Sequence, residues 1–243
     1  MNKDKIQKMK PDFVDKLPDL DYAVVCLQGS RMLGMAMSED ADYDYRGVYV
    51  AKNRDLLAFH GKPKETIEGG SYGDDEIEWV FHEVEKFMRL AVKSNPSVVH
   101  LFFVPEYNLL SDVGRLLIDS KDLFLSEPLV RAAFGGYAMS QMVYLKNNRG
   151  NAKRREKHVR HCFRLFDSGK ELLETGHMTL PLYNAEYYIE LGKKINEEGG
   201  FEELYKLFEE KDREFQAVKS TLPEQPDLEA VNKLLIKIRG YES

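Results

Sequence analysis

Three acidic residues have the types and spacing that suit chemistry best. Asp42 and Asp44 open one short β-type run, and Glu78 lies in another. Side chains two residues apart on a strand point to the same face, so Asp42 and Asp44 should lie together. Adjacent carboxylates repel each other unless a cation lies between them. Because Mg²⁺ prefers carboxylate and phosphate oxygens, the pattern predicts a divalent-metal site made by Asp42, Asp44 and Glu78, with Glu76 as the alternative third ligand.

Two other interpretations of the aspartate pair compete with a metal site. An exposed acidic turn is the plainer one, because Glu39 and Asp40 come just before the pair. A calcium-binding loop is the other, but Tyr45 stands where that loop needs glycine and Ala51 stands where it needs glutamate. The calcium loop is therefore excluded.

A glycine and a serine upstream of the acids are suited to binding phosphate. Gly29-Ser30 ends an apolar run, and eleven residues separate Ser30 from Asp42. A glycine lets phosphate approach the backbone closely, and the start of a following helix presents free N–H groups. Ser30 can add a hydroxyl hydrogen bond. Arg46 shares the carboxylate face, where it either contacts phosphate or neutralises the two aspartates.

A basic segment, Lys146–Arg164, stands out in this acidic chain. It holds eight Lys and Arg residues and one acid. On a helix, Lys157, His161 and Arg164 fall on the side opposite an apolar stripe, so they either form a solvated face or line the active-site cleft and bind a phosphate-bearing ligand there. We expect this segment to contact RNA if RNA is a partner.

Composition limits the class of protein. The chain has 243 residues, 43% apolar and 31% charged, and a net charge of −6. This negative balance argues against extended nucleic-acid duplex binding. Cys26 and Cys162 form no metal-ligand or disulfide pattern. The first residues contain no apolar signal region and no stretch is long enough to span a bilayer, so we expect a cytoplasmic protein without a membrane partner.

The periodicity of the chain changes part of the way along. Short strand-like runs cover 22–27, 45–50 and 77–81, with a loose Gly-rich segment expected at 60–76. From Glu83 the pattern is mostly helical, with helices expected at 109–119, 127–147, 154–173, 184–197 and 201–219, and a last one capped by Asp227. The fold class expected is α+β. A small mixed-sheet domain, residues 1–105, is followed by an all-helical domain, residues 106–243.

The order of these motifs resembles the DNA polymerase β-type nucleotidyltransferase superfamily. The Gly29-Ser30 pair, the Asp42-Tyr43-Asp44 triplet and the later Glu78 follow its signature. Longer stretches resemble the nucleotidyltransferases associated with RNA repair pathways, namely residues 29–34, 38–48, 86–96 and 157–165. The resemblance covers about 22–176.

The resemblance implies a nucleotidyltransferase core with a helical domain that completes the nucleotide and acceptor cleft. It implies a nucleoside triphosphate held by Gly29 and Ser30, and two Mg²⁺ ions, or Mn²⁺, held by Asp42 and Asp44, with Glu78 where the superfamily more often has aspartate. The expected reaction moves NMP to a hydroxyl and releases pyrophosphate. The acceptor is an RNA end, a protein or a small molecule; a nucleotide- or RNA-binding module without turnover is the alternative. The sequence leaves the oligomeric state open.

Overall fold

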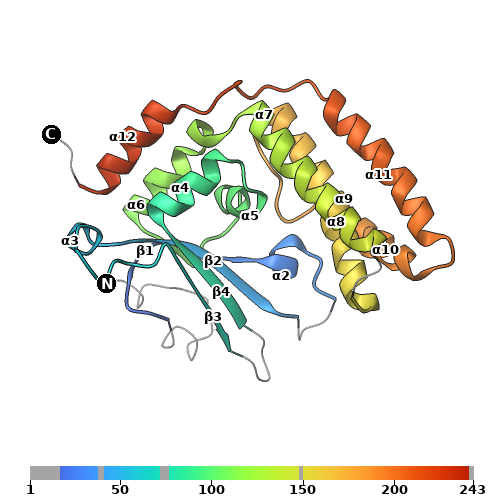
Figure 1. Ribbon diagram of the computed structural model, residues 1–243, viewed down its shortest axis with the longest axis horizontal. Coiled ribbons are helices and arrows are strands. Elements are labelled where there is room, and N and C mark those ends of the chain that lie inside the picture. The colour runs from blue at the N-terminus through green and yellow to red at the C-terminus, as the bar shows by residue number, and fades with distance from the viewer. Residues whose placement is uncertain (1–16, 38–40, 72–76, 148–149, 241–243) are drawn as a thin grey trace. The chain divides into compact units, whose positions relative to one another are not determined.

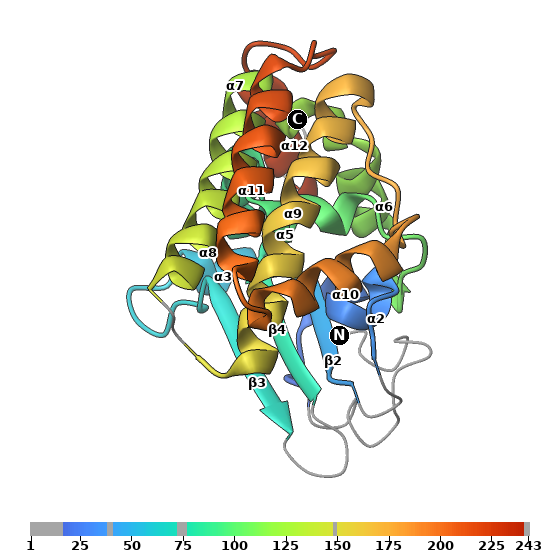
Figure 2. The ribbon, with the colours of Figure 1, turned by 90° about the vertical axis from the view of Figure 1, so that its right-hand side faces the viewer.

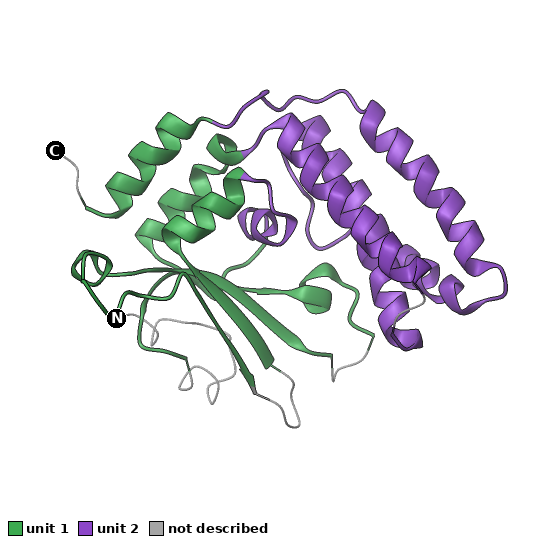
Figure 3. Ribbon diagram, viewed as in Figure 1, with its two compact units in different colours: residues 1–92, 104–124, 227–243 green, residues 93–103, 125–226 purple. Residues whose placement is uncertain are grey.

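The computed structural model describes residues 17–37, 41–71, 77–147 and 150–240. The chain divides into two compact units (Figure 3). Unit 1 comprises 1–92, 104–124 and 227–243, and unit 2 comprises 93–103 and 125–226. Each unit is therefore assembled from separate stretches of chain, whereas the sequence pattern predicts contiguous domains that meet at residue 105. Contacts between distant segments, which periodicity does not report, account for this difference.

Unit 1 is an α+β unit built on one mixed sheet. Its strands are β1 (Asp21–Gln28), β2 (Tyr43–Val50), β3 (Thr66–Ser71), β4 (Ile77–Glu83) and β5 (Leu109–Leu110). They lie in the order β3-β4-β2-β1-β5, with β2 and β4 parallel and the other neighbours antiparallel. Its helical segments are α2 (Gly29–Leu33), α3 (Asn53–Leu56), α4 (Val84–Val92), α6 (Asp112–Asp119), η3 (Lys121–Phe124) and α12 (Leu228–Ile238).

Both faces of this sheet are buried over part of their length. One face carries an apolar cluster that includes Tyr22, Tyr45, Tyr49 and Phe81. On the other face Val24 and Val48 are paired and fully buried, and helices α4 and α6 lie over the sheet with α12 beside α4 (Figure 1). The sheet is thus a rigid base for side chains at the ends of its strands.

Three of the expected strands are confirmed, and two expectations are wrong. The segment 60–76 is not loose throughout, because β3 pairs along β4 and so gains a partner for its backbone groups. Leu109 and Leu110 form a strand paired with Val24 and Val25 rather than the start of a helix. The helix that follows begins at Asp112, where Ser111 Oγ accepts a hydrogen bond from the Gly114 N–H at 3.1 Å.

Unit 2 is helical. It contains α5 (Pro96–Val99), η2 (His100–Phe102), α7 (Glu127–Val130), η4 (Arg131–Gly135), α8 (Gly136–Lys146), α9 (Ala152–Thr175), α10 (Ala185–Lys193), η5 (Lys194–Asn196) and α11 (Gly200–Ala217). Helices α8 and α11 both lie along α9 (Figure 2). The ring of Phe166 on α9 packs against Phe208 and Phe215 of α11, with centroids 5.3 and 5.7 Å apart. The apolar stripe expected on this helix is therefore buried.

Candidate functional site

Asp44 and Glu78 hold paired positions on two neighbouring parallel strands. The register of β2 and β4 places Asp44 opposite Glu78, so both side chains project from the same face of the sheet. Asp42 lies two residues earlier, just before β2 begins at Tyr43. Tyr45 points to the other face, where it is buried in the apolar cluster. The backbone thus brings the expected acids to one end of one face.

The side chains at this end are arranged more openly than a preformed metal site. Asp44 Oδ1 lies 3.6 Å from Arg46 Nη2, and Glu78 is exposed. Within the described ranges, no three His, Cys, Asp or Glu side chains gather closely enough to hold a metal ion. The carboxylate oxygens of these residues are nevertheless of the kind that Mg²⁺ prefers. Glu76, the alternative ligand, lies outside the described residues.

Gly29 contacts the Asp44 carboxylate directly. Gln28 pairs with Asp44 across β1 and β2, and Gly29 follows with φ +68°. A Cβ placed on Gly29 would lie 2.0 Å from Asp44 Oδ2. Ser30 comes next in the first turn of α2, and no described residue bonds its hydroxyl oxygen. The glycine–serine turn therefore lies directly against Asp44.

Arg31 holds this turn against β2, and the sequence pattern did not indicate it. Its Nε donates a hydrogen bond to the Ala41 carbonyl at 2.8 Å. Its guanidinium lies 3.8 Å from the centroid of the Tyr43 ring. Both contacts connect α2 with the two residues that flank Asp42 in the sequence. Arg31 lies in the stretch 29–34 that carries the family resemblance, but that resemblance gives it no role of its own.

The three expected nucleotide-binding residues of unit 2 differ in exposure. Lys157 is exposed, His161 is half-buried, and Arg164 is only 3% exposed. The expectation of an open basic face is wrong for Arg164, because His100 of η2 covers it. Arg164 Nη1 donates to His100 Nε2 and Arg164 Nη2 donates to His161 Nδ1, both at 2.8 Å. His100 was missed by sequence reasoning, although a histidine within the apolar run 98–104 was a signal.

The rest of the basic segment divides into exposed and structural residues. Lys146, Lys153 and Arg154 are exposed. Arg155 instead donates to the Ile195 carbonyl at 2.8 Å, and Arg160 lies 4.0 Å from Glu156 in an ion pair. The cations available to an RNA phosphate are thus fewer than the count of basic residues indicates.

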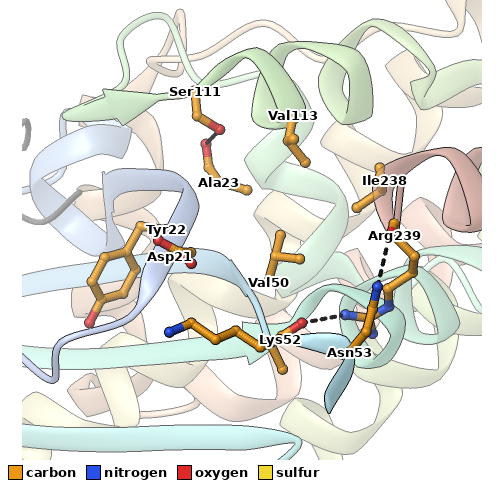
Figure 4. Close-up of a pocket in the computed structure, with 11 residues that line it drawn as sticks. Asp21, Tyr22, Ala23, Val50, Lys52, Asn53, Ser111, Val113, Ile238 and Arg239 are labelled. Atoms are coloured by element: carbon orange, nitrogen blue, oxygen red, sulfur yellow. Dashed lines mark hydrogen bonds between the residues drawn. The ribbon is translucent and has the colours of Figure 1, made fainter. Parts of the chain in front are cut away.

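A separate pocket of about 360 Å³ lies at the other end of β1 and β2 (Figure 4). Its polar groups mainly fasten α12 to the sheet. Asn53 Nδ2 donates to the Arg239 carbonyl at 2.8 Å, and Arg239 Nη1 donates to the Ala51 carbonyl at 3.1 Å. The Ser111 hydroxyl donates to the Ala23 carbonyl at 3.2 Å. Because these groups are already bonded, we assign the pocket no chemistry.

Comparisons with known proteins place the chain in a family. A family model described as RlaP, RNA repair pathway DNA polymerase beta family, matches residues 17–237. A solved nucleotidyltransferase-like protein from Exiguobacterium sibiricum 255-15 is similar at 11% identity, covering 92% of this chain and 75% of its own, with a TM-score of 0.34. No curated protein matches. In the part of the chain that the structure describes, no helix is both long and apolar enough to cross a membrane.

Proposed function

Because the chain belongs to the RNA repair pathway DNA polymerase beta family, we propose that it is an enzyme that transfers NMP from a nucleoside triphosphate to an acceptor hydroxyl. The observation that carries this proposal is the pairing of Asp44 with Glu78 beside the Gly29-Ser30 turn. A descendant without catalysis has no physical reason to keep two carboxylates together at this place. The arrangement therefore favours turnover over simple nucleotide binding.

The proposed reaction is an in-line displacement at the α-phosphorus. The acceptor oxygen forms a bond to the α-phosphorus as the bond to the bridging oxygen breaks, and pyrophosphate leaves. The hydroxyl proton passes to the Glu78 carboxylate. Gly29 and Ser30 hold the triphosphate through backbone N–H groups and the free serine hydroxyl.

Asp42, Asp44 and Glu78 would hold divalent cations, two of Mg²⁺ or Mn²⁺, as the family resemblance implies. When bound, these cations supply charge neutralisation for the phosphates. Arg46 pairs with Asp44 at 3.6 Å, so it offsets part of the negative charge of the acids. When nucleotide binds, we expect the Arg46 guanidinium to turn toward a phosphate, because Asp44 would then bind a cation instead of Arg46.

We propose an RNA end as the acceptor. The family description names RNA repair, and exposed cations at Lys146, Lys153 and Arg154 are suited to phosphate backbones. Lys157, His161 and Arg164 are proposed to bind phosphate of the nucleotide or of the RNA. A protein hydroxyl remains the competing acceptor and is distinguished by the experiment below.

The test measures pyrophosphate released from each of the four NTPs with Mg²⁺ and a pool of short RNAs. We expect release with wild-type protein and at least a hundredfold loss in Asp44→Asn. Glu209→Gln is the matched control, because it removes one negative charge from an exposed position on α11. Normal turnover by Asp44→Asn would show the site assignment to be wrong. Mass spectrometry of the products then identifies the acceptor, because the modified RNA or protein gains the mass of one NMP.

A further inference from the structure

Arg164 in unit 2 is a buried cation without a carboxylate partner. Its side chain is 3% exposed, and its only hydrogen bonds among the described residues go to His100 and His161. Its Nε is buried and has no hydrogen-bond partner among the residues that the structure describes. Within the described ranges, no ion pair joins this guanidinium to Asp or Glu; Tyr188, which favours its charged form, donates its hydroxyl to Asp167. The cluster of Arg164, His100 and His161 therefore carries an unbalanced positive charge.

A buried charge of this kind is costly unless an anion compensates it. Burial lowers the pKa of Arg164 to about 10, so the guanidinium still carries its charge at neutral pH. Removing a cation from water without a partner opposes folding. Since arginine matches the geometry of phosphate and carboxylate, and no described carboxylate forms an ion pair with Arg164, an anionic ligand is the partner that its chemistry favours.

The guanidinium also determines which ring nitrogens carry protons. All of its polar hydrogens are donors, so His100 Nε2 and His161 Nδ1 must both accept. His161 is then a neutral ring with its proton on Nε2. No described residue bonds that Nε2–H, and the His161 ring is partly exposed. Lys157 lies one turn earlier on α9 and is exposed.

We propose that this cluster binds a phosphate group. His161 Nε2–H and Lys157 Nζ donate hydrogen bonds to the phosphate, and the buried Arg164 supplies positive charge beside them. His100 is a positioning residue, because it acts on the ligand only by orienting Arg164. The inference rests on the proposed function for the source of the phosphate, which is either the nucleoside triphosphate or an RNA. The local arrangement itself is independent of turnover.

The first test uses inorganic tripolyphosphate without Mg²⁺ and follows the histidine ring nitrogens by NMR. The free protein should show His161 as the neutral Nε2–H form at pH 7, and tripolyphosphate should shift its Nε2 signal in a saturable way. His60, which is exposed, serves as the internal reference. A His161 ring protonated on Nδ1, or a ring that does not respond to millimolar tripolyphosphate, would overturn the proposal.

The second test measures tripolyphosphate affinity in variants by calorimetry. Arg164→Gln should weaken binding at least tenfold and Arg164→Lys less, whereas Lys170→Gln, elsewhere on α9, should leave it unchanged. Lys157→Gln changes only an exposed side chain, so its expected loss tests the site even if Arg164→Gln fails to fold. His100→Gln should move the His161 Nδ1 signal, which a purely structural role of His100 would not do.

Comparing ligands separates the two phosphate sources. Competition of tripolyphosphate by NTP, but not by 5′-phosphorylated RNA, would assign the site to the nucleotide, and the reverse result would assign it to RNA. In Asp44→Asn, pyrophosphate release should be lost while the His161 response remains. If wild-type protein releases no pyrophosphate but His161 responds, the proposed function fails and the phosphate site stands. Pyrophosphate release without a His161 response would contradict the phosphate site and leave the proposed function standing.

Discussion

The Asp44 carboxylate occupies the space that a side chain at Gly29 would fill. A Cβ on Gly29 would lie 2.0 Å from Asp44 Oδ2 and 2.7 Å from Asp44 Cγ. Pairing of Gln28 with Asp44 forces this approach, because Gly29 continues directly from β1. A glycine is thus required at this turn for two reasons, its φ of +68° and its lack of a side chain.

We expect Gly29→Ala to abolish pyrophosphate release and to lower the free energy of unfolding by more than the cost of the backbone conformation alone, about 1–2 kcal/mol. Gly61→Ala is the matched control, because Gly61 has φ +72° but nothing within 4 Å of its Cβ position. Urea unfolding of both variants gives the comparison. Equal destabilisation by the two substitutions would mean that Asp44 simply moves aside.

The buried ion pair between Arg239 and Glu83 fastens α12 to the sheet. Arg239 Nη2 lies 2.8 Å from Glu83 Oε1, and the two side chains are 8% and 5% exposed. Arg239→Ala should lower the free energy of unfolding by about 3–5 kcal/mol, since the buried Glu83 carboxylate then has no cation and only the Ala51 and Glu85 N–H groups as donors. Lys233→Ala breaks an exposed pair with Glu229 on the same helix and should cost at most about 1 kcal/mol. A small effect of Arg239→Ala would show that water reaches Glu83.

Acid should destabilise unit 2 through its buried histidines. Burial, together with the charge of Arg164, lowers the pKa of His161 to about 3, and burial also holds that of His100 well below its usual range. The unfolded chain binds these protons from about pH 6.5 downward and the folded protein does not. Stability is therefore fully present above pH 6.5 and is lost as pH falls, by about 1.4 kcal/mol per pH unit for each histidine.

The measurement is the urea midpoint of the protein between pH 7 and pH 4. His161→Gln removes one titrating ring. The free energy of unfolding should therefore fall less steeply with falling pH, by the contribution of one proton. Parallel curves for wild type and His161→Gln would contradict the assignment of a neutral buried His161.

RNA affinity should depend on the exposed cations of α8 and α9. Lys146→Gln and Lys153→Gln should each weaken binding of a short RNA and reduce the salt dependence by about one ion. Lys206→Gln, an exposed position on α11, is the charge-matched control. Filter binding across a range of salt concentrations gives the slopes. An unchanged slope in the first two variants would exclude this segment as the RNA contact.

Local pattern was sufficient to identify the strands that carry Asp44 and Glu78. Short strand-like runs placed Asp44 at the opening of one strand and Glu78 within another, and β1, β2 and β4 are confirmed where those runs indicated them. The segment leading to β4 was misjudged, because β3 is ordered by pairing with β4 and not by its own composition. Helix periodicity also located α9 but not the burial of Arg164.

The sequence by itself determined the fold class, the order of the motifs and the residue types available for phosphate and metal chemistry. These follow from periodicity and spacing, which act between residues near in the chain. Only the tertiary structure decided that Asp44 pairs with Glu78, that Asp44 fills the space beside Gly29, and that His100 covers Arg164. Strand register and side-chain burial arise from contacts between distant segments, and a helix or strand pattern does not specify which distant side chain will lie against it.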